Sequence, residues 1–356
     1  MSTAAQRVLL VLVPLAVTAF ELSIVIGRHT LGLDFRGWYW QAGHRVLEGV
    51  SPYAGGEAGH ALNYPAFGAL LFAPLGALPR DAATIVFVLL VAGSLPVSLR
   101  LLGVRDWRVY AAVLLWQPVM VGWETANVSL LIVCGLAVIW RHRDRPAIAG
   151  VVLALLVSVK FFVAPVGLWL LLTRRFRAAA WAVAATVLLN LVSWAILGFD
   201  QVSVYVHVLG QFAGAAQLWG YSLIGLMRHL GAAEPVADAV GVLAAGAVIA
   251  GALRVARERR DRVLFGAAIG ACILASPIVE THYLTLILVP LALAAPRLRA
   301  AWLMPILLIL TPADHPAIWQ HAFSLVISSG VLLWSLFGYP PALRRSYSEE
   351  LPSPAT

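Results

Sequence analysis

A few titratable residues stand out in a chain that carries little charge. Asp34 and Arg36 follow the first long apolar segment and begin the polar stretch 33–65. Lys160 is the only lysine among 25 lysine and arginine residues, and it lies between two apolar segments. Glu280 and His282 lie together in SPIVETHY, residues 276–283. A carboxylate or an imidazole can accept a proton from a hydroxyl group, and an ammonium can bind phosphate. These residue types could therefore act as a general base and as a phosphate-binding charge.

Each of these residues also has a plain structural interpretation. Asp34 could cap a helix over 35–48 with its side-chain oxygen. Lys160 could extend to the membrane interface as an anchor, and His282 could lie in water at the headgroups. Glu21, inside the first apolar segment, could be functional or could pair with Arg28. The spacing alone leaves these alternatives open.

The composition indicates an integral membrane protein. Of the 356 residues, 61% are hydrophobic and only 12% are charged, whereas about a quarter of the residues in soluble domains are charged. The net charge of +8 is better explained by basic cytoplasmic loops than by nucleic-acid binding. Cys134 and Cys272 lie in apolar runs, and no disulfide framework or metal motif follows from them.

The hydropathy pattern predicts an all-α, polytopic membrane protein with about twelve transmembrane helices. Some segments are short, notably the two around Lys160, which could tilt or form a hairpin that crosses only partway. Interfacial helices are expected over 35–48, over the apolar piece between Pro65 and Pro79, and over 221–231. The twelve segments are 8–27, 82–102, 107–122, 126–140, 147–159, 161–173, 178–198, 236–253, 263–276, 282–296, 300–312 and 318–338.

The basic residues predict the orientation. With the N-terminus inside, the arginine clusters near 100–108, 141–145, 174–177, 254–262 and 297–299 all fall in inner loops, as the positive-inside rule favours. Both termini are then cytoplasmic, and most histidines and carboxylates face outward. We therefore expect one transmembrane domain over 1–345, a disordered cytoplasmic tail over 346–356, and an active site on the extracytoplasmic face of the cell membrane.

The order of the motifs resembles that of polytopic glycosyltransferases of the GT-C type. It is most similar to family 87, which includes actinobacterial polyprenol-phosphate-mannose-dependent α-(1→2)-mannosyltransferases, and the resemblance covers most of the chain. The similar segments are Asp34, Trp38-Tyr39, GVSPY at 49–53, Tyr64-Pro65, NVSLLIVCGLAVIW at 127–140, RHRDR at 141–145, AIAGVVLALLVSVK at 147–160, YSLIGLMRHLG at 221–231 and SPIVETHY.

This resemblance implies roles for particular residues. Asp34 would be the essential loop carboxylate, His282 would match the position proposed for the base, and Lys160 would hold the lipid-linked phosphate. In the mechanism expected here, Asp34 or His282 takes the hydroxyl proton, or the two act as a relay, and Arg36 could assist Lys160 at the donor phosphate. The family usually has Gly-Gln before the asparagine, and this chain has Glu124-Thr125-Ala126 before Asn127. The late motif commonly has Trp-Asp before paired histidines, whereas here Glu280 and Thr281 precede His282 and Tyr283 follows it, so the sugar and the acceptor do not carry over. The residues expected to bind substrate are Tyr64, Glu124, Asn127, Tyr221 and Glu280.

The expected activity is transfer of a sugar, with mannose as the first candidate, from a polyprenyl-phosphate donor to a glycolipid or glycan acceptor, with inversion. No cofactor, metal ion or nucleic acid is expected. Arabinofuranose from the same lipid carrier is an alternative sugar. A transporter or flippase of lipid-linked sugars is an alternative class, although such proteins often show paired halves, and no internal repeat is visible here. A purely structural subunit would leave the single lysine and the outer histidines unexplained.

Overall fold

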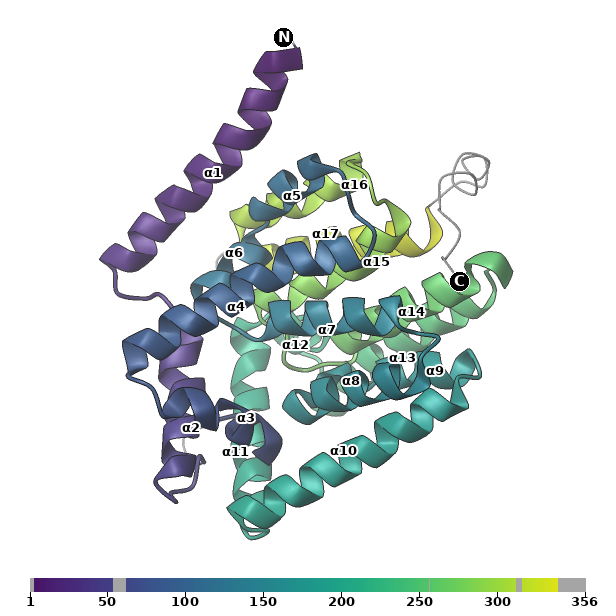
Figure 1. Cartoon of the computed structure of the whole chain (residues 1–356). Helices are drawn as coiled ribbons and strands as arrows, with labels where there is room; N and C mark the ends of the chain where they lie inside the picture. Colours follow the sequence, from purple (N-terminus) through teal and green to yellow (C-terminus); the bar gives the residue numbers. More distant parts are fainter. Residues whose placement is uncertain (1–2, 54–61, 256, 312–315, 339–356) are drawn as a thin grey trace, which may run out of the picture.

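The computed structural model describes residues 3–53, 62–255, 257–311 and 316–338, and within these ranges every regular element is helical (Figure 1). The all-α prediction is confirmed for this part of the chain; the tail predicted over 346–356 lies outside it. The first half contains α1 (Thr3–Gly27), the π-helical turn η1 (Phe35–Tyr39), α2 (Trp40–Leu47), α3 (Ala66–Gly76), α4 (Arg80–Leu101), α5 (Trp107–Leu114), α6 (Gln117–Glu124), α7 (Ser129–Arg141), α8 (Pro146–Val159), η2 (Phe161–Val163) and α9 (Val166–Leu172).

The second half contains α10 (Phe176–Leu197), α11 (Gln201–Trp219), α12 (Leu223–His229), α13 (Glu234–Leu253), α14 (Arg257–Leu274), η3 (Thr281–Ile287), α15 (Leu288–Ala294), α16 (Ala300–Leu303), η4 (Met304–Leu310) and α17 (Ile318–Phe337). Each of the twelve predicted segments contains a helix. Helix α11 was not predicted, because Gln201, His207 and Gln211 interrupt its apolar run.

The number of membrane spans is not confirmed at about twelve. Among the described residues, four helices are long and apolar enough to cross a membrane: α4, α10, α13 and α17. Helices α6 and α7 would form a fifth span if counted together, although they meet at a bend of 112°. Other apolar helices are shorter; α8, with 14 residues, is about 21 Å long, against a hydrocarbon core of about 30 Å.

Helix α2, within the polar stretch 33–65, and helix α3, directly after this stretch, form a compact pair. Gly43 and Gly76 face each other's backbones so closely that a side chain at either position would collide with the opposite helix. This approach lets Tyr39 stack on Phe72 with ring centroids 4.7 Å apart. The pair therefore fixes the position of Tyr39 and of Tyr64, which immediately precedes α3.

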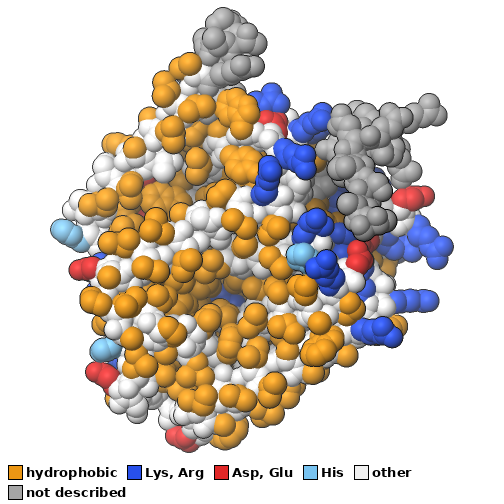
Figure 2. Space-filling model, viewed as in Figure 1, with side chains coloured by type: hydrophobic (Ala, Val, Ile, Leu, Met, Phe, Trp, Pro, Cys, Tyr) orange, Lys and Arg blue, Asp and Glu red, His pale blue; other side chains and the backbone are white. Residues whose placement is uncertain are grey.

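One end of the helix bundle is basic. Arginine side chains gather at one side of the view in Figure 2, while hydrophobic side chains cover much of the remaining surface. At this end Asp261 accepts a bidentate contact from Arg175, at 2.7 and 3.0 Å, and a hydrogen bond from Trp169 Nε1 at 2.9 Å. These contacts tie the turn between α9 and α10 to α14.

Candidate functional site

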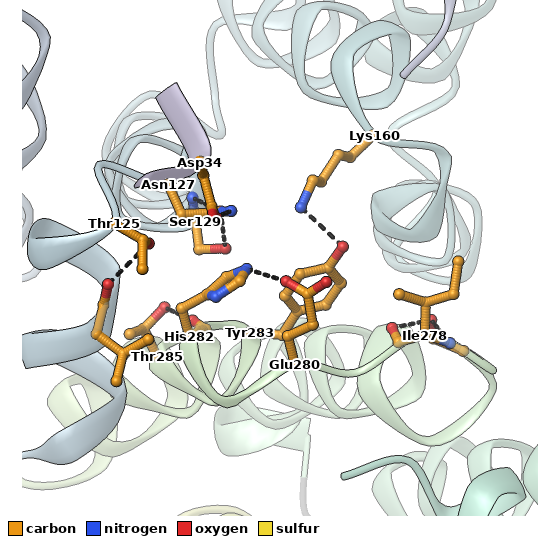
Figure 3. Close-up of polar contacts among 12 residues, drawn as sticks. Asp34, Thr125, Asn127, Ser129, Lys160, Ile278, Glu280, His282, Tyr283 and Thr285 are labelled. Atoms are coloured by element: carbon orange, nitrogen blue, oxygen red, sulfur yellow. Dashed lines mark hydrogen bonds and ion pairs between the residues drawn. The ribbon is translucent and has the colours of Figure 1, made fainter. Parts of the chain in front are cut away.

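Five polar residues from four breaks between helices converge at one place (Figure 3). Asp34 follows α1, Asn127 lies in the break between α6 and α7, and Lys160 ends α8. Glu280 directly precedes η3, and His282 belongs to it. Breaks expose backbone and side-chain groups that a continuous apolar helix would not present, so these interruptions build the site.

The break between α6 and α7 positions the first pair, Asp34 and Asn127. Ala126 adopts φ 53°, and the chain reverses direction there. The Thr125 carbonyl accepts the backbone N–H of Asp34 at 3.0 Å. Asn127 Nδ2 then donates to Asp34 Oδ2 at 2.6 Å. Asp34 makes no side-chain capping bond to the turn that follows, so the interpretation of Asp34 as a helix cap is wrong.

Lys160 points into the protein. Its Nζ donates to the Tyr283 hydroxyl at 2.7 Å, and it lies 4.0 Å from the centroid of the Tyr283 ring and 4.8 Å from that of Tyr64. Only 6% of the residue is exposed. The interpretation of Lys160 as an interfacial anchor is therefore wrong.

Glu280 and His282 form a close pair. His282 Nε2 lies 2.9 Å from Glu280 Oε2, which is an ion pair by distance without the alignment of a good hydrogen bond. His282 is 3% exposed, so it does not lie in water at the headgroups. The carboxylate of Glu280 is thus placed to hold a positive charge on the imidazole.

These residues lie outside the four long spans, and burial affects their ionisation differently. Burial raises the pKa of Asp34, against the opposing effects of His282, Asn127 and Lys160. Burial also opposes ionisation of Glu280, but His282 and Lys160 outweigh it and lower the pKa of Glu280. Burial lowers the pKa of Lys160 to about 8, although Glu280 and Asp34 favour its charged form. A carboxyl of raised pKa beside charged groups is a typical general-base arrangement.

The structure does not bring every predicted residue to this place. Arg36 pairs with Asp81 at 2.7 Å on the surface. The charged groups that act on the Glu124 carboxyl are Glu21, in α1, and Arg28, just after it, and Asp34 is not among them.

Two further predicted substrate-binding residues lie near the site. Tyr221 donates its backbone N–H to the Val279 carbonyl at 2.6 Å, next to Glu280, and its ring packs edge-on against His321. Tyr64 is joined to the site through Tyr39, whose hydroxyl lies 2.6 Å from that of Tyr64.

Sequence reasoning did not predict Tyr39, Ser129 or Tyr283 as site residues. Ser129 holds the Asn127 side chain through its N–H and its hydroxyl, at 3.0 and 2.8 Å. Tyr39 accepts from Asn127 at 2.8 Å. Buried tyrosines resemble core residues in a sequence, and only their adjacency to Trp38 and His282 could have drawn attention to them.

An apolar cavity of about 550 Å³ opens beside Lys160. Tyr64, Lys160 and Tyr283 line it at the site, and Val206 and Leu209 of α11 line it farther away. Its volume is in the range of cavities that hold small ligands. The remaining lining residues are Asn63, Pro65, Phe161, Phe162, Pro165, Tyr205, Gly210, Ala213, Ala271, Cys272, Ala275, Ser276, Pro277 and Ile278.

The ligand atoms of Asp34, Glu280 and His282 all lie within 4.8 Å of one another, close enough to hold a metal ion. Each of the three side chains already has a polar partner, because Asn127 donates to Asp34 and His282 contacts Glu280. Lys160 also supplies a positive charge nearby. The donor set can therefore be satisfied by protein groups alone.

The fold and the site together define a helical membrane protein with a charged site at the end of an apolar cavity. The chain belongs to glycosyltransferase family 87, whose model matches residues 62–277. The match includes Asn127 and Lys160 but not Asp34, Glu280 and His282, which lie in the same site. Arg36 also lies outside the match.

A curated relative from Mycolicibacterium smegmatis is a polyprenol-phosphate-mannose-dependent alpha-(1-2)-phosphatidylinositol pentamannoside mannosyltransferase. It is 26% identical over 239 residues, which cover 62% of this chain and 57% of the relative. The aligned part therefore spans little more than half of that protein. No solved structure matches this chain.

Proposed function

We propose that this protein transfers mannose from a polyprenyl-phosphate donor to a glycolipid or glycan acceptor. Membership of glycosyltransferase family 87 supports the class of reaction. The M. smegmatis relative uses a polyprenol-phosphate-mannose donor and a glycolipid acceptor, which supports the donor and the class of acceptor proposed here. The arginine clusters at the opposite end of α7 and α8 support a site on the extracytoplasmic face of the membrane, because basic loops favour the cytoplasmic side.

The observation that carries the proposal is that Lys160 lines the apolar cavity and that Asp34 lies near enough to Lys160 for each group to affect the pKa of the other. A prenyl chain would occupy the apolar part of the cavity, between α11 and the segment 271–278. Lys160 would then bind the phosphate as a point charge. The sugar would project toward Asp34, Glu280 and His282.

The proposed reaction is a single displacement with inversion. The acceptor oxygen forms a bond to the anomeric carbon while the bond from that carbon to the phosphate oxygen breaks. Asp34 takes the hydroxyl proton, and the leaving polyprenyl phosphate takes the bonding electron pair. Lys160 stabilises the negative charge that grows on that phosphate. The Glu280–His282 pair lies beside Asp34 and can hold the hydroxyl group of the acceptor or exchange its proton. No metal ion is needed in this scheme.

The test is transfer by the purified protein. Polyprenyl-phosphate-mannose and polyprenyl-phosphate-arabinose are each offered with membrane glycolipid extracts, with and without EDTA, and mass spectrometry reports the product. We expect a mannosylated product that EDTA does not reduce. Asp34→Asn, present in the membrane at the normal level, should lose at least about a thousandfold in kcat, because a proton acceptor is removed.

Undiminished transfer by Asp34→Asn would exclude Asp34 as the base. An arabinosylated product alone would replace mannose as the sugar. Movement of the intact donor across vesicles without any covalent product would identify a flippase instead. Arg36→Gln serves as the matched control, since Arg36 pairs with Asp81 at the surface, and it should transfer at close to the normal rate.

A further inference from the structure

The hydrogen bonds around Asn127 have a defined direction. Asn127 Oδ1 accepts the backbone N–H of Ser129, so the NH₂ group must point the other way, toward Asp34 and Tyr39. Tyr39 therefore accepts a hydrogen from Asn127. Its own hydroxyl lies 2.6 Å from the hydroxyl of Tyr64. The pair holds two hydroxyl hydrogens but shares only one hydrogen bond, so one hydrogen is left over.

Either hydroxyl could donate in this bond, so its direction is inferred from what surrounds each tyrosine. Tyr39 is packed between Phe72 and Phe87, whereas Tyr64 lines the cavity beside Lys160. If the chain of donors continues in one direction, Asn127 donates to Tyr39 and Tyr39 donates to Tyr64. The hydrogen of Tyr64 then remains available on the cavity side.

Tyr283 also lines the cavity, and its hydroxyl likewise keeps a hydrogen that it can donate. An ammonium group can only donate, so Tyr283 accepts from Lys160 Nζ and keeps its own hydroxyl hydrogen. Phe162 stacks on the Tyr283 ring at 4.8 Å and fixes its direction. Burial raises the pKa of both Tyr64 and Tyr283, so both phenols stay protonated. Lys160 has further N–H groups beyond the one that it gives to Tyr283.

We propose that the hydroxyl groups of Tyr64 and Tyr283 bind the phosphate of the lipid donor together with Lys160, as a site made only of hydrogen-bond donors. This inference rests on the proposed function, since it takes the cavity ligand to be a polyprenyl phosphate ester. The phosphate oxygens of the donor diester only accept hydrogen bonds at neutral pH, so a set of three donors matches them. A neutral polyprenol has a single uncharged hydroxyl oxygen, so it could accept hydrogen bonds from at most some of these three donors.

This arrangement also bears on catalysis. The phosphate diester of the donor carries one negative charge, and the leaving phosphate monoester carries nearly two at neutral pH. Donors aimed at that oxygen bind more strongly as the charge grows, so they favour the transition state over the bound donor. Removing either hydroxyl should therefore lower kcat as well as raise KM for the donor.

The test compares two probes of equal chain length, a polyprenyl monophosphate and the corresponding polyprenol, binding to the full-length purified protein. We expect the wild type to bind the phosphate at least a hundredfold more tightly than the alcohol. Tyr64→Phe and Tyr283→Phe should each weaken phosphate binding about tenfold and leave polyprenol binding unchanged, because a hydrogen bond to a charged group is lost while the ring remains. Tyr110→Phe is the matched control, since its hydroxyl donates to the Val104 carbonyl in the turn after α4, and it should behave as the wild type.

Polyprenol binding and the thermal unfolding of each variant report whether it folds. If a variant does not fold, 3-fluorotyrosine at position 64 or 283 in the otherwise unchanged protein replaces it. Its ¹⁹F signal should shift with the monophosphate and not with the polyprenol. Unchanged phosphate selectivity in both folded variants, or no selective ¹⁹F shift, would overturn the inference.

The transfer assay separates this inference from the proposed function. Sugar transfer by the wild type with unchanged kcat and KM in both phenylalanine variants would reject the tyrosine site and keep the function. Absence of any transfer alongside selective phosphate binding would reject the function and keep the tyrosines as phosphate ligands.

Discussion

Asn127 is the residue through which several parts of the site are connected. Its amide oxygen accepts two hydrogen bonds from Ser129, and its amide nitrogen donates to Asp34 and to Tyr39. All four hydrogen-bonding positions of the side chain are therefore occupied. A residue satisfied in this way has one orientation, and it fixes both the proposed base and the first tyrosine of the proposed phosphate site.

The first residue-scale prediction concerns Asn127→Leu, which keeps the size of the side chain and removes the donor to Asp34. The hydrogen bond from Asn127 lowers the pKa of Asp34 against the larger effect of burial, so its loss should raise that pKa further. Asp34 accepts a proton only as the carboxylate, so activity falls as the pH drops through its pKa. The acidic limb of kcat against pH should move to higher pH.

Asn190→Leu is the control, because Asn190 binds Ser158 and the Thr186 carbonyl away from Asp34. It should leave the acidic limb in place. An acidic limb that stays fixed in Asn127→Leu, with transfer still measurable, would assign that limb to a group other than Asp34.

Lys160 gives the second residue-scale prediction. Burial lowers its pKa to about 8, and its ammonium form is the one that can bind phosphate. Deprotonation above that pH removes the positive charge of Lys160, so the affinity for the phosphate falls. We expect kcat/KM for the lipid donor to fall above about pH 8, while Lys160→Met should be weak at every pH and should lack this limb. A basic limb that persists in Lys160→Met would contradict the assignment.

At the scale of elements, the site depends on where helices stop. The hydropathy of the chain predicts the helical segments well, since each predicted segment contains a helix in the structure. It also predicts the break at 123–125 between α6 and α7, but it does not predict the angle of 112° between these helices. Nor does it predict the break between α5 and α6 inside the segment 107–122, because an apolar run gives no signal for a turn. The bend between α6 and α7 is held by Asp34, whose backbone N–H binds the Thr125 carbonyl from a distant part of the sequence.

The same reasoning explains which site residues the sequence could predict. Asp34, Lys160 and His282 are unusual residues in an apolar chain, so their type alone marks them. Tyr39 and Tyr283 are ordinary aromatic residues of a membrane protein, and their role follows only from hydrogen-bond partners that folding brings together. Arg36 is one of many arginines in the chain, and its side chain pairs with Asp81 at 2.7 Å.

The element-scale prediction tests the bend through Ala126. Its φ of 53° is a conformation that glycine adopts easily and that a β-branched residue strongly disfavours. Ala126→Val should therefore destabilise the protein by about 1–3 kcal/mol and lower transfer at least tenfold, because Asn127 is displaced. Ala126→Gly should retain transfer. Thermal unfolding and kcat of the two variants measure this; a valine variant equal to the wild type in both would show that the bend tolerates a strained residue.

At the scale of the whole molecule, the proposed site and the arginines lie at opposite ends of the same helices. Helix α7 begins next to Asn127 and ends at Arg141, and α8 returns from Pro146 to Lys160. The contacts of Asp261 with Arg175 and Trp169 then hold the basic end together. Helices α7 and α8 therefore run between the proposed site at one end of the bundle and the basic cluster at the other.

This separation makes the orientation in the membrane testable with two exposed carboxylates. The side chain of Glu48, at the C-terminal end of α2, is 57% exposed, and that of Asp144, in the turn between α7 and α8, is 80% exposed. Glu48→Cys should react with a membrane-impermeant thiol reagent in intact cells, whereas Asp144→Cys should react only after permeabilisation. Both are made in a background with Cys134→Ala and Cys272→Ala, which serves as the unlabelled control. The reverse labelling pattern would place the site on the cytoplasmic face, where the lipid-linked donor and acceptor would have to be sought instead.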